Sequence, residues 1–142
     1  MGMAPVPPQS ASPPSSARDA SLHLTLEGLR GARGTVRLCI WASDEGFPDC
    51  KSSASAMRVH APATGERVEL DVPNLAPGDY GVSVIHDEND NRELDKAIFG
   101  LPTEGVGFSN NASAPFGPPA FQRVQFHVAG ETEQTIRLKY YL

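Results

Sequence analysis

The chain has 142 residues, enough for one domain with a substantial core and too few for two of ordinary size. Its formal net charge is −5 at pH 7, and its Lys and Arg residues form no cluster. Nucleic acids and anionic membranes need a concentrated basic surface, and a membrane-spanning helix needs about 18 consecutive apolar residues. The sequence has neither, so we expect no nucleic-acid partner and no membrane span.

Residues 1–20 are rich in Pro, Ser and Ala and lack the basic start and apolar stretch of a secretory signal. A composition of this kind favours an extended, disordered leader. Such leaders often lie between a removed export signal and a folded domain. We therefore predict a disordered leader over residues 1–20 and a single folded domain over residues 21–142.

From Ser21 onward, apolar and polar residues alternate, which is the pattern of a β-strand with one buried face. The predicted strands cover residues 22–26, 36–40, 68–72, 80–84, 124–128 and 136–140, with a short edge strand over 55–60. Gly- and Pro-containing turns separate them, and no window has the period of a helix. The phrase LAPGDYGV is similar to the L-x-P-G-x-Y-x-V phrase of transthyretin-like sandwiches. The sequence predicts an all-β domain, an immunoglobulin-like or transthyretin-like antiparallel β-sandwich of about seven strands, with a small closed barrel as the alternative.

The two cysteines, Cys39 and Cys50, are eleven positions apart. Paired metal-binding thiolates usually have CxxC spacing and further Cys or His ligands, which this sequence lacks. A disulfide and two unrelated thiols both fit the spacing. On its predicted strand, Cys39 shares the face opposite the core with Arg37 and Trp41, and we expect it to lie under a covering loop.

The stretch HDENDNRELD, residues 86–95, follows directly on a predicted strand. Counted from its first Asp, oxygen side chains occupy positions 1, 3, 5 and 9, and position 7 can offer a backbone carbonyl. Such alternation suits Ca²⁺, which takes six to eight oxygen ligands. Five carboxylates lie within nine residues and would repel one another without a cation among them. The predicted calcium ligands are Asp87, Asn89, Asn91, Glu93 and Asp95.

This stretch does not fit an EF-hand, because Arg92 and Ile98 stand where that loop has its Gly and its closing Glu. We predict a structural calcium loop carried by a strand, with a solvated turn of Asp and Asn residues as the alternative. His86 shares the parity of the inward residues before it. We expect it to be buried and hydrogen-bonded, and to orient the loop.

Residues 97–121 form a long segment rich in Gly, Pro and Asn, without clear secondary structure. Connections of this length are usually functional or packed down as surface loops. We predict an interaction loop that folds over the sandwich, with Phe108, Asn110, Asn111 and Phe116 as its contact residues.

Four phrases, HDENDNRELD, FGLPTEGVGFSNNA, FGPPAF and IRLKYYL, resemble the DUF2141 family of bacterial exported proteins. The resemblance covers about residues 21–142 and implies a small periplasmic or secreted β-sandwich whose activity is unassigned. Members typically have Gly in the acidic loop where this chain has Asp90 and Arg92, which weakens the expected metal site. The exported setting implied by the resemblance favours a disulfide between Cys39 and Cys50.

Together these features predict a non-enzymatic exported module, monomeric or weakly dimeric, that meets an unknown protein or cell-envelope partner. The alternative is a carrier of a small apolar or carbohydrate ligand, lined by Trp41 and the Phe residues. A hydrolase using His86 and Ser109 is less favoured, because the sequence has no G-x-S-x-G, HExxH or Cys-His arrangement.

Overall fold

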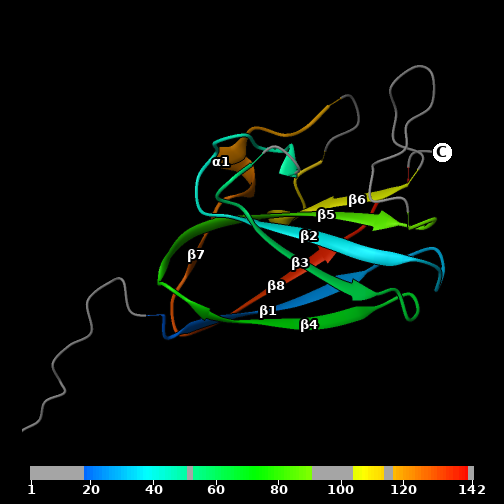
Figure 1. Cartoon of the computed structure of the whole chain (residues 1–142), viewed down its shortest axis with the longest axis horizontal. Coiled ribbons are helices and arrows are strands. Elements are labelled where there is room, and N and C mark those ends of the chain that lie inside the picture. The colour runs from blue at the N-terminus through cyan, green and yellow to red at the C-terminus, as the bar shows by residue number, and fades with distance from the viewer. Residues whose placement is uncertain (1–17, 51–52, 91–103, 114–116, 141–142) are drawn as a thin grey trace, which may run out of the picture.

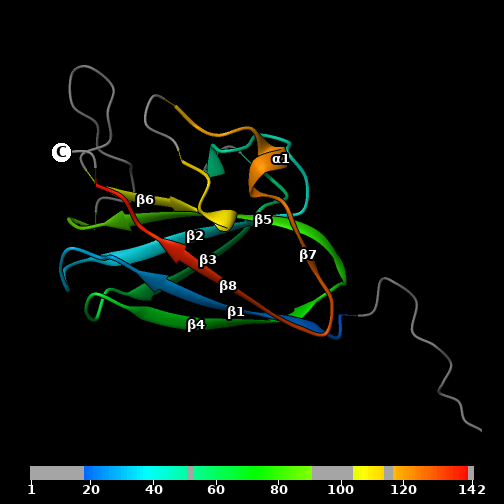
Figure 2. The same cartoon turned by 180° about the vertical axis from the view of Figure 1, so that it is seen from behind.

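Two β-sheets face each other in a sandwich (Figure 1), and the computed structural model describes residues 18–50, 53–90, 104–113 and 117–140. The three-stranded sheet has the order β4 (Val68–Leu75), β1 (Ala20–Glu27), β8 (Glu131–Arg137). The other sheet has the order β3 (Met57–Pro62), β2 (Thr35–Trp41), β5 (Gly78–Asp87), β6 (Gly105–Phe108), and β7 (Phe126–Val128) pairs with the start of β5. The predicted all-β sandwich is confirmed. Its strands pair antiparallel except β1 and β8, which run parallel along one edge (Figure 2).

The core lies between the sheets and is built from the alternating residues that the sequence places inward. Leu22, Leu24 and Leu26 of β1 are fully buried, and the inward residues of β2 and β5 pack against them. At the turn into β5, the Tyr80 hydroxyl donates a hydrogen bond of 2.6 Å to the carbonyl of Ala76. This contact resembles the tyrosine corner of immunoglobulin-like sandwiches, where a Tyr near a strand start fixes the preceding turn.

Three predicted elements differ from the structure. The strand expected over residues 124–128 is divided into a short helix, α1 (Phe121–Val124), and β7. Val124 is fully buried, and it and Phe121 pack on Gly81, where a Cβ would lie 2.9 Å from both side chains. The final strand begins earlier than expected and ends at Arg137, although Lys139 still forms an isolated bridge with Val106.

The third difference is β6, which lies inside the segment predicted to lack secondary structure. Its sequence, GVGF, has Gly at alternate positions, and Gly is a weak strand former. The fold needs these glycines because of close packing. A Cβ at Gly105 would come 2.5 Å from the Tyr140 ring, and one at Gly107 would come 2.8 Å from Ile136.

A second, smaller cluster lies on the outer face of the five-stranded sheet. Cys39 and Trp41 of β2 point away from the main core, yet they are only 6% and 1% exposed. The segment after β2 folds back over them, as Figure 1 shows above β2, so the expected covering loop is confirmed. Within the described parts of the chain, no helix has the length and apolar character needed to cross a membrane.

Candidate functional site

The end of β5 carries the start of the acidic stretch, and His86 is fully buried there as predicted. Its Nε2 lies 2.7 Å from the carbonyl oxygen of Arg33, and its Nδ1 lies 2.7 Å from the Tyr140 hydroxyl. A carbonyl only accepts, so Nε2 carries a proton and donates it, while Nδ1 and the Tyr140 hydroxyl bond each other. His86 thereby joins the β1–β2 connection to the end of the chain.

The Asp87 carboxylate is also fully buried, and its partner is an arginine. Arg37 of β2 donates from Nε to Asp87 Oδ2 at 2.8 Å, and its Nη2 lies 3.6 Å from Asp90 Oδ1. The Thr35 hydroxyl donates to the same Asp90 oxygen at 2.6 Å. Asp90 has a positive φ of 56°, which Asp tolerates better than most residues. The first turn of the acidic stretch is therefore fixed onto the start of β2.

Glu88 is held by a second arginine. The Arg30 guanidinium donates from Nε and Nη2 to the two Glu88 oxygens at 3.0 and 2.7 Å. This fork lowers the pKa of Glu88 below its ordinary value of 4.5. The same guanidinium stacks 4.5 Å from the centre of the Tyr140 ring, and burial raises the pKa of the Tyr140 phenol. Arg30 thus connects the carboxylate to the ring that also bonds His86.

Glu104, which follows residues 91–103 in the sequence, also bonds the end of β5. Its side chain is 3% exposed, and it accepts a hydrogen bond of 3.1 Å from the backbone N–H of Glu88. This bond therefore joins the end of β5 to the residue that precedes β6.

Close backbone contact at Gly34 brings these groups together. Gly34 has φ +76°, and a Cβ there would lie 2.1 Å from the carbonyl oxygen of Asp87. The β1–β2 connection lies directly against the end of β5, and only Gly fits this position. We call this set of contacts the loop-end network; its members are Arg30, Gly34, Arg37, His86, Asp87, Glu88, Glu104 and Tyr140.

The predicted calcium ligands are only partly described. Asn91, Glu93 and Asp95 lie outside the described residues, Asn89 is exposed, and Asp87 is paired with Arg37. Among the residues that the structure describes, no three His, Cys, Asp or Glu side chains are arranged to hold a metal ion. Calcium binding stays a prediction.

Sequence reasoning missed the two arginines that neutralise this stretch. The expected repulsion among its carboxylates is relieved in part by Arg30 and Arg37, which lie 58 and 50 positions from their partners Glu88 and Asp87 in the chain. Only the register of the strand pairing indicates that Arg37 lies beside Asp87. Thr35 is opposite Asp87 in the β2–β5 pair, which places Arg37 diagonally across from Asp87 on the same face.

The predicted interaction-loop residues have contacts within the chain. Phe108 lies in β6 and is 9% exposed, and Phe116 lies outside the described residues. The exposed Asn110 donates to the carbonyls of Arg123 and Gln125. Whether these residues also bind a partner stays a prediction.

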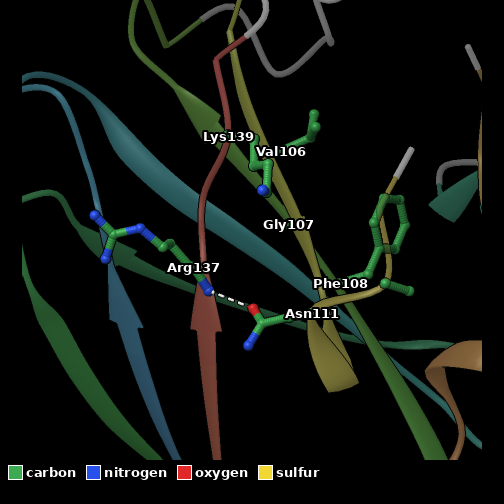
Figure 3. A pocket seen from close by; sticks show the side chains of 7 residues that line it. Val106, Gly107, Phe108, Asn111, Arg137 and Lys139 are labelled. Carbon is green, nitrogen blue, oxygen red and sulfur yellow. Dashed lines mark hydrogen bonds between the residues drawn. The ribbon is translucent and has the colours of Figure 1, made fainter. Parts of the chain in front are cut away.

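Asn111 joins the two sheets at their edges. Its side-chain amide donates to the carbonyl of Thr135. The same amide accepts from the N–H of Arg137 (Figure 3), so it bonds β8 as a neighbouring strand would. It lines a small hollow together with Val106, Gly107, Phe108, Ala112, Arg137 and Lys139. The Arg137 guanidinium bonds Glu27 at 3.3 Å instead of filling this hollow.

The aromatic residues considered for a ligand site pack against one another. The Phe47 ring lies edge-on to three others, with centroid distances of 5.2 Å to Trp41, 6.1 Å to Phe108 and 5.2 Å to Phe121. A disulfide joins Cys39 to Cys50 beside them, as the family resemblance implied. We call these four rings and the disulfide the ring cluster.

Ser109, the candidate nucleophile, is fully buried beside the ring cluster. Its hydroxyl accepts from the N–H of Val82 at 3.0 Å and donates to the carbonyl of Val124. Both functions of the hydroxyl are used to join β5 to α1, so Ser109 has a structural role.

Comparison with protein families gives one match, over residues 24–137, to a family described as an uncharacterized protein conserved in bacteria, DUF2141. Comparisons with curated proteins and with solved structures gave no match. The family match covers most of the chain and includes the ring cluster and every member of the loop-end network except Tyr140. The chain therefore belongs to the DUF2141 family of bacterial proteins.

Proposed function

We propose that this protein is a non-enzymatic periplasmic or secreted module that binds a protein or cell-envelope partner through its loop end. The observation that carries the proposal is the loop-end network. Its arginines and His86 bond the end of β5 to the β1–β2 connection, to β2 and to Tyr140. Glu104, the residue before β6, bonds the same end of β5.

Such a network suits recognition because it reduces the cost of binding. A surface that is ordered only on binding loses conformational entropy at that moment, whereas residues already held in place, such as Asp87 and Glu88, lose less. The bonds from Arg30 to Glu88 and from Arg37 to Asp87 are charge-assisted, which is the stronger kind. The partner would meet the exposed residues of the same end, such as Asn89.

The proposed location rests on the disulfide and on the family. Disulfides persist mainly in oxidising compartments such as the bacterial periplasm, and the Cys39–Cys50 bond is compatible with that setting. A cell fractionation of the native host tests it, since the protein should be found outside the cytoplasm.

A structural calcium ion in residues 87–95 is a separate part of the proposal. It draws on the spacing of oxygen side chains, while the pairing of Asp87 with Arg37 would require this carboxylate to serve both partners. Thermal melting with excess Ca²⁺ and with EDTA tests it. A higher midpoint in Ca²⁺ is expected, and identical midpoints would remove calcium from the account without affecting the partner-binding proposal.

Two observations favour a binding module over the alternatives. The hydroxyl of Ser109 and both ring nitrogens of His86 are occupied by internal hydrogen bonds, which weighs against a hydrolase that uses them. Phe47 occupies the space between the other rings of the ring cluster, which weighs against a carrier with an open aromatic site.

Site-specific photo-crosslinking in the native host tests partner binding. A photoreactive amino acid at Asn89 reports on the loop end, and one at the exposed Ala129, in the β7–β8 turn at the other end of the sandwich, serves as the matched control (Figure 1). A discrete crosslinked species from position 89 alone is expected. Equal crosslinking from both positions, or none from position 89, would contradict the proposal.

A further inference from the structure

A covered aromatic surface lies at the other end of β2 from the loop-end network. Residues 42–50, which we call the cover, pass over the outer face of the five-stranded sheet (Figure 1). Beneath them Trp41 is 1% exposed, while most residues of the cover itself are exposed. The cover thus hides an aromatic surface without contributing to the main core.

Backbone hydrogen bonds within the cover are local. The N–H of Phe47 donates to Asp44 at 3.0 Å, and that of Asp49 donates to Gly46 at 2.7 Å. These bonds shape the cover as turns and do not join it to the sheet.

Attachment to the sheet runs through side chains near the end of the cover. Phe47 packs among the other rings, and Cys50 is bonded to Cys39 of β2. The Arg58 guanidinium of β3 also donates to the Cys50 carbonyl. The disulfide is the one covalent link among these, and Cys50 is its more exposed end, since Cys39 is 6% exposed.

We propose that the Cys39–Cys50 disulfide is a redox-controlled latch: a dithiol reductant opens it, the cover moves away, and the surface around Trp41 becomes accessible while the sandwich stays folded. One thiolate of the dithiol attacks Sγ of Cys50, and the bond to Cys39 breaks with Cys39 leaving as a thiolate that takes up a proton. The second thiol of the dithiol then attacks the mixed disulfide and releases Cys50 as a thiol. Two electrons and two protons pass from the dithiol, which becomes a disulfide, to the two cysteines.

The sandwich is expected to survive this step because its core is separate. The main core is formed between the sheets, and neither Cys39 nor Trp41 belongs to it. β2 is paired with β5 along its whole length and with β3 from Thr35 to Ile40. The Trp41 indole N–H keeps its hydrogen bond of 2.9 Å to Ser83 Oγ on the neighbouring strand. Opening of the cover removes no strand pairing.

The full chain can be tested directly, because Trp41 is its single tryptophan. Oxidised protein and protein reduced with dithiothreitol are compared by Trp emission, acrylamide quenching and far-ultraviolet circular dichroism. Reduction is expected to shift the emission to longer wavelength and to raise the quenching constant about threefold or more, with an unchanged sheet signal. A double variant, Cys39→Ser with Cys50→Ser, should show the open values without reductant and should not respond to it.

Two results would overturn the latch. One is unchanged emission and quenching after complete reduction, verified by thiol titration. This result would show that the packing of Phe47 holds the cover in place without the disulfide. Loss of the sheet signal on reduction would make the bond necessary for the whole fold. The wild-type measurement decides between these outcomes even where the double variant does not fold.

Discussion

One strand, β2, runs between two clusters that are held by different forces. Near its start, Arg37 belongs to the loop-end network, where charge-assisted hydrogen bonds join segments distant in the sequence. Near its end, Trp41 and Cys39 belong to the ring cluster, where aromatic contacts and one covalent bond hold the cover. All three side chains lie on the same outer face of the sheet.

Because different forces hold them, we expect that the loop-end network and the ring cluster can be destabilised independently. Buried ion pairs fail when a partner is removed or neutralised, because the remaining charge is left without compensation. An apolar cluster responds little to charge, and a disulfide responds to reductant. A change aimed at one cluster should therefore leave the other intact.

The largest effect is expected from Gly34→Ala, at the centre of the loop-end network. The new Cβ would lie 2.1 Å from a backbone oxygen, in a left-handed conformation that Ala adopts reluctantly. We expect a loss of about 3 kcal/mol or more in the free energy of unfolding, measured by urea denaturation. Gly31→Ala is the matched control, because nothing lies within 4 Å of its Cβ position. A small loss at Gly34 would show that the β1–β2 connection does not lie against the end of β5.

Arg37→Ala should have the next largest effect. The Asp87 side chain is 1% exposed, and removing Arg37 takes away the ion pair of 2.8 Å between them. We expect a loss of about 2–4 kcal/mol. Arg137→Ala removes the more exposed pair with Glu27, in which the Arg137 side chain is 62% exposed, and should cost under about 1 kcal/mol. Equal losses in the two variants would contradict the buried network.

Ser109→Ala sharpens the comparison from the side of the ring cluster. It removes the partner of the Val82 N–H and of the Val124 carbonyl, both in a fully buried position. A loss of about 1–3 kcal/mol is expected. The exposed Ser113→Ala is the control and should be neutral within about 0.5 kcal/mol. A neutral Ser109 variant would mean that other groups bond these backbone atoms.

The smallest effect concerns pH. The pKa of Glu88 is lowered in the folded protein by Arg30, so its stabilisation is present above the ordinary value of 4.5 and is lost as pH falls through the lowered pKa. Glu88→Gln should flatten the dependence of the melting temperature on pH below about 4.5. Trp41 emission, followed in the same native samples, should stay constant. An unchanged slope in the variant would argue against the Arg30 pair.

The main core and its strands could be predicted because burial on one face leaves a period of two in the sequence. The same parity placed His86 inward and Cys39 on the outer face, and the structure confirms both positions. β6 escaped prediction because close packing against Tyr140 and Ile136 selects Gly where strand propensity would select branched residues.

The loop-end network could not be predicted for a different reason. Its counter-charges come from residues 58 and 50 positions away, and only the β2–β5 register brings Arg37 beside Asp87. Asn111 likewise reads as an exposed loop residue, and only the tertiary fold shows that its amide serves as a strand neighbour for β8. Local patterns define which face a residue takes, whereas its partner depends on how distant strands pair.

Amide hydrogen exchange tests the independence of the two clusters most directly, because it follows both in one sample. In oxidised wild-type protein, reduced wild-type protein and oxidised Arg37→Ala, exchange is compared for residues 43–50 and for residues 86–90. Reduction should accelerate exchange in residues 43–50 alone, and Arg37→Ala should accelerate it in residues 86–90 alone. Acceleration of both segments by either change would contradict the account.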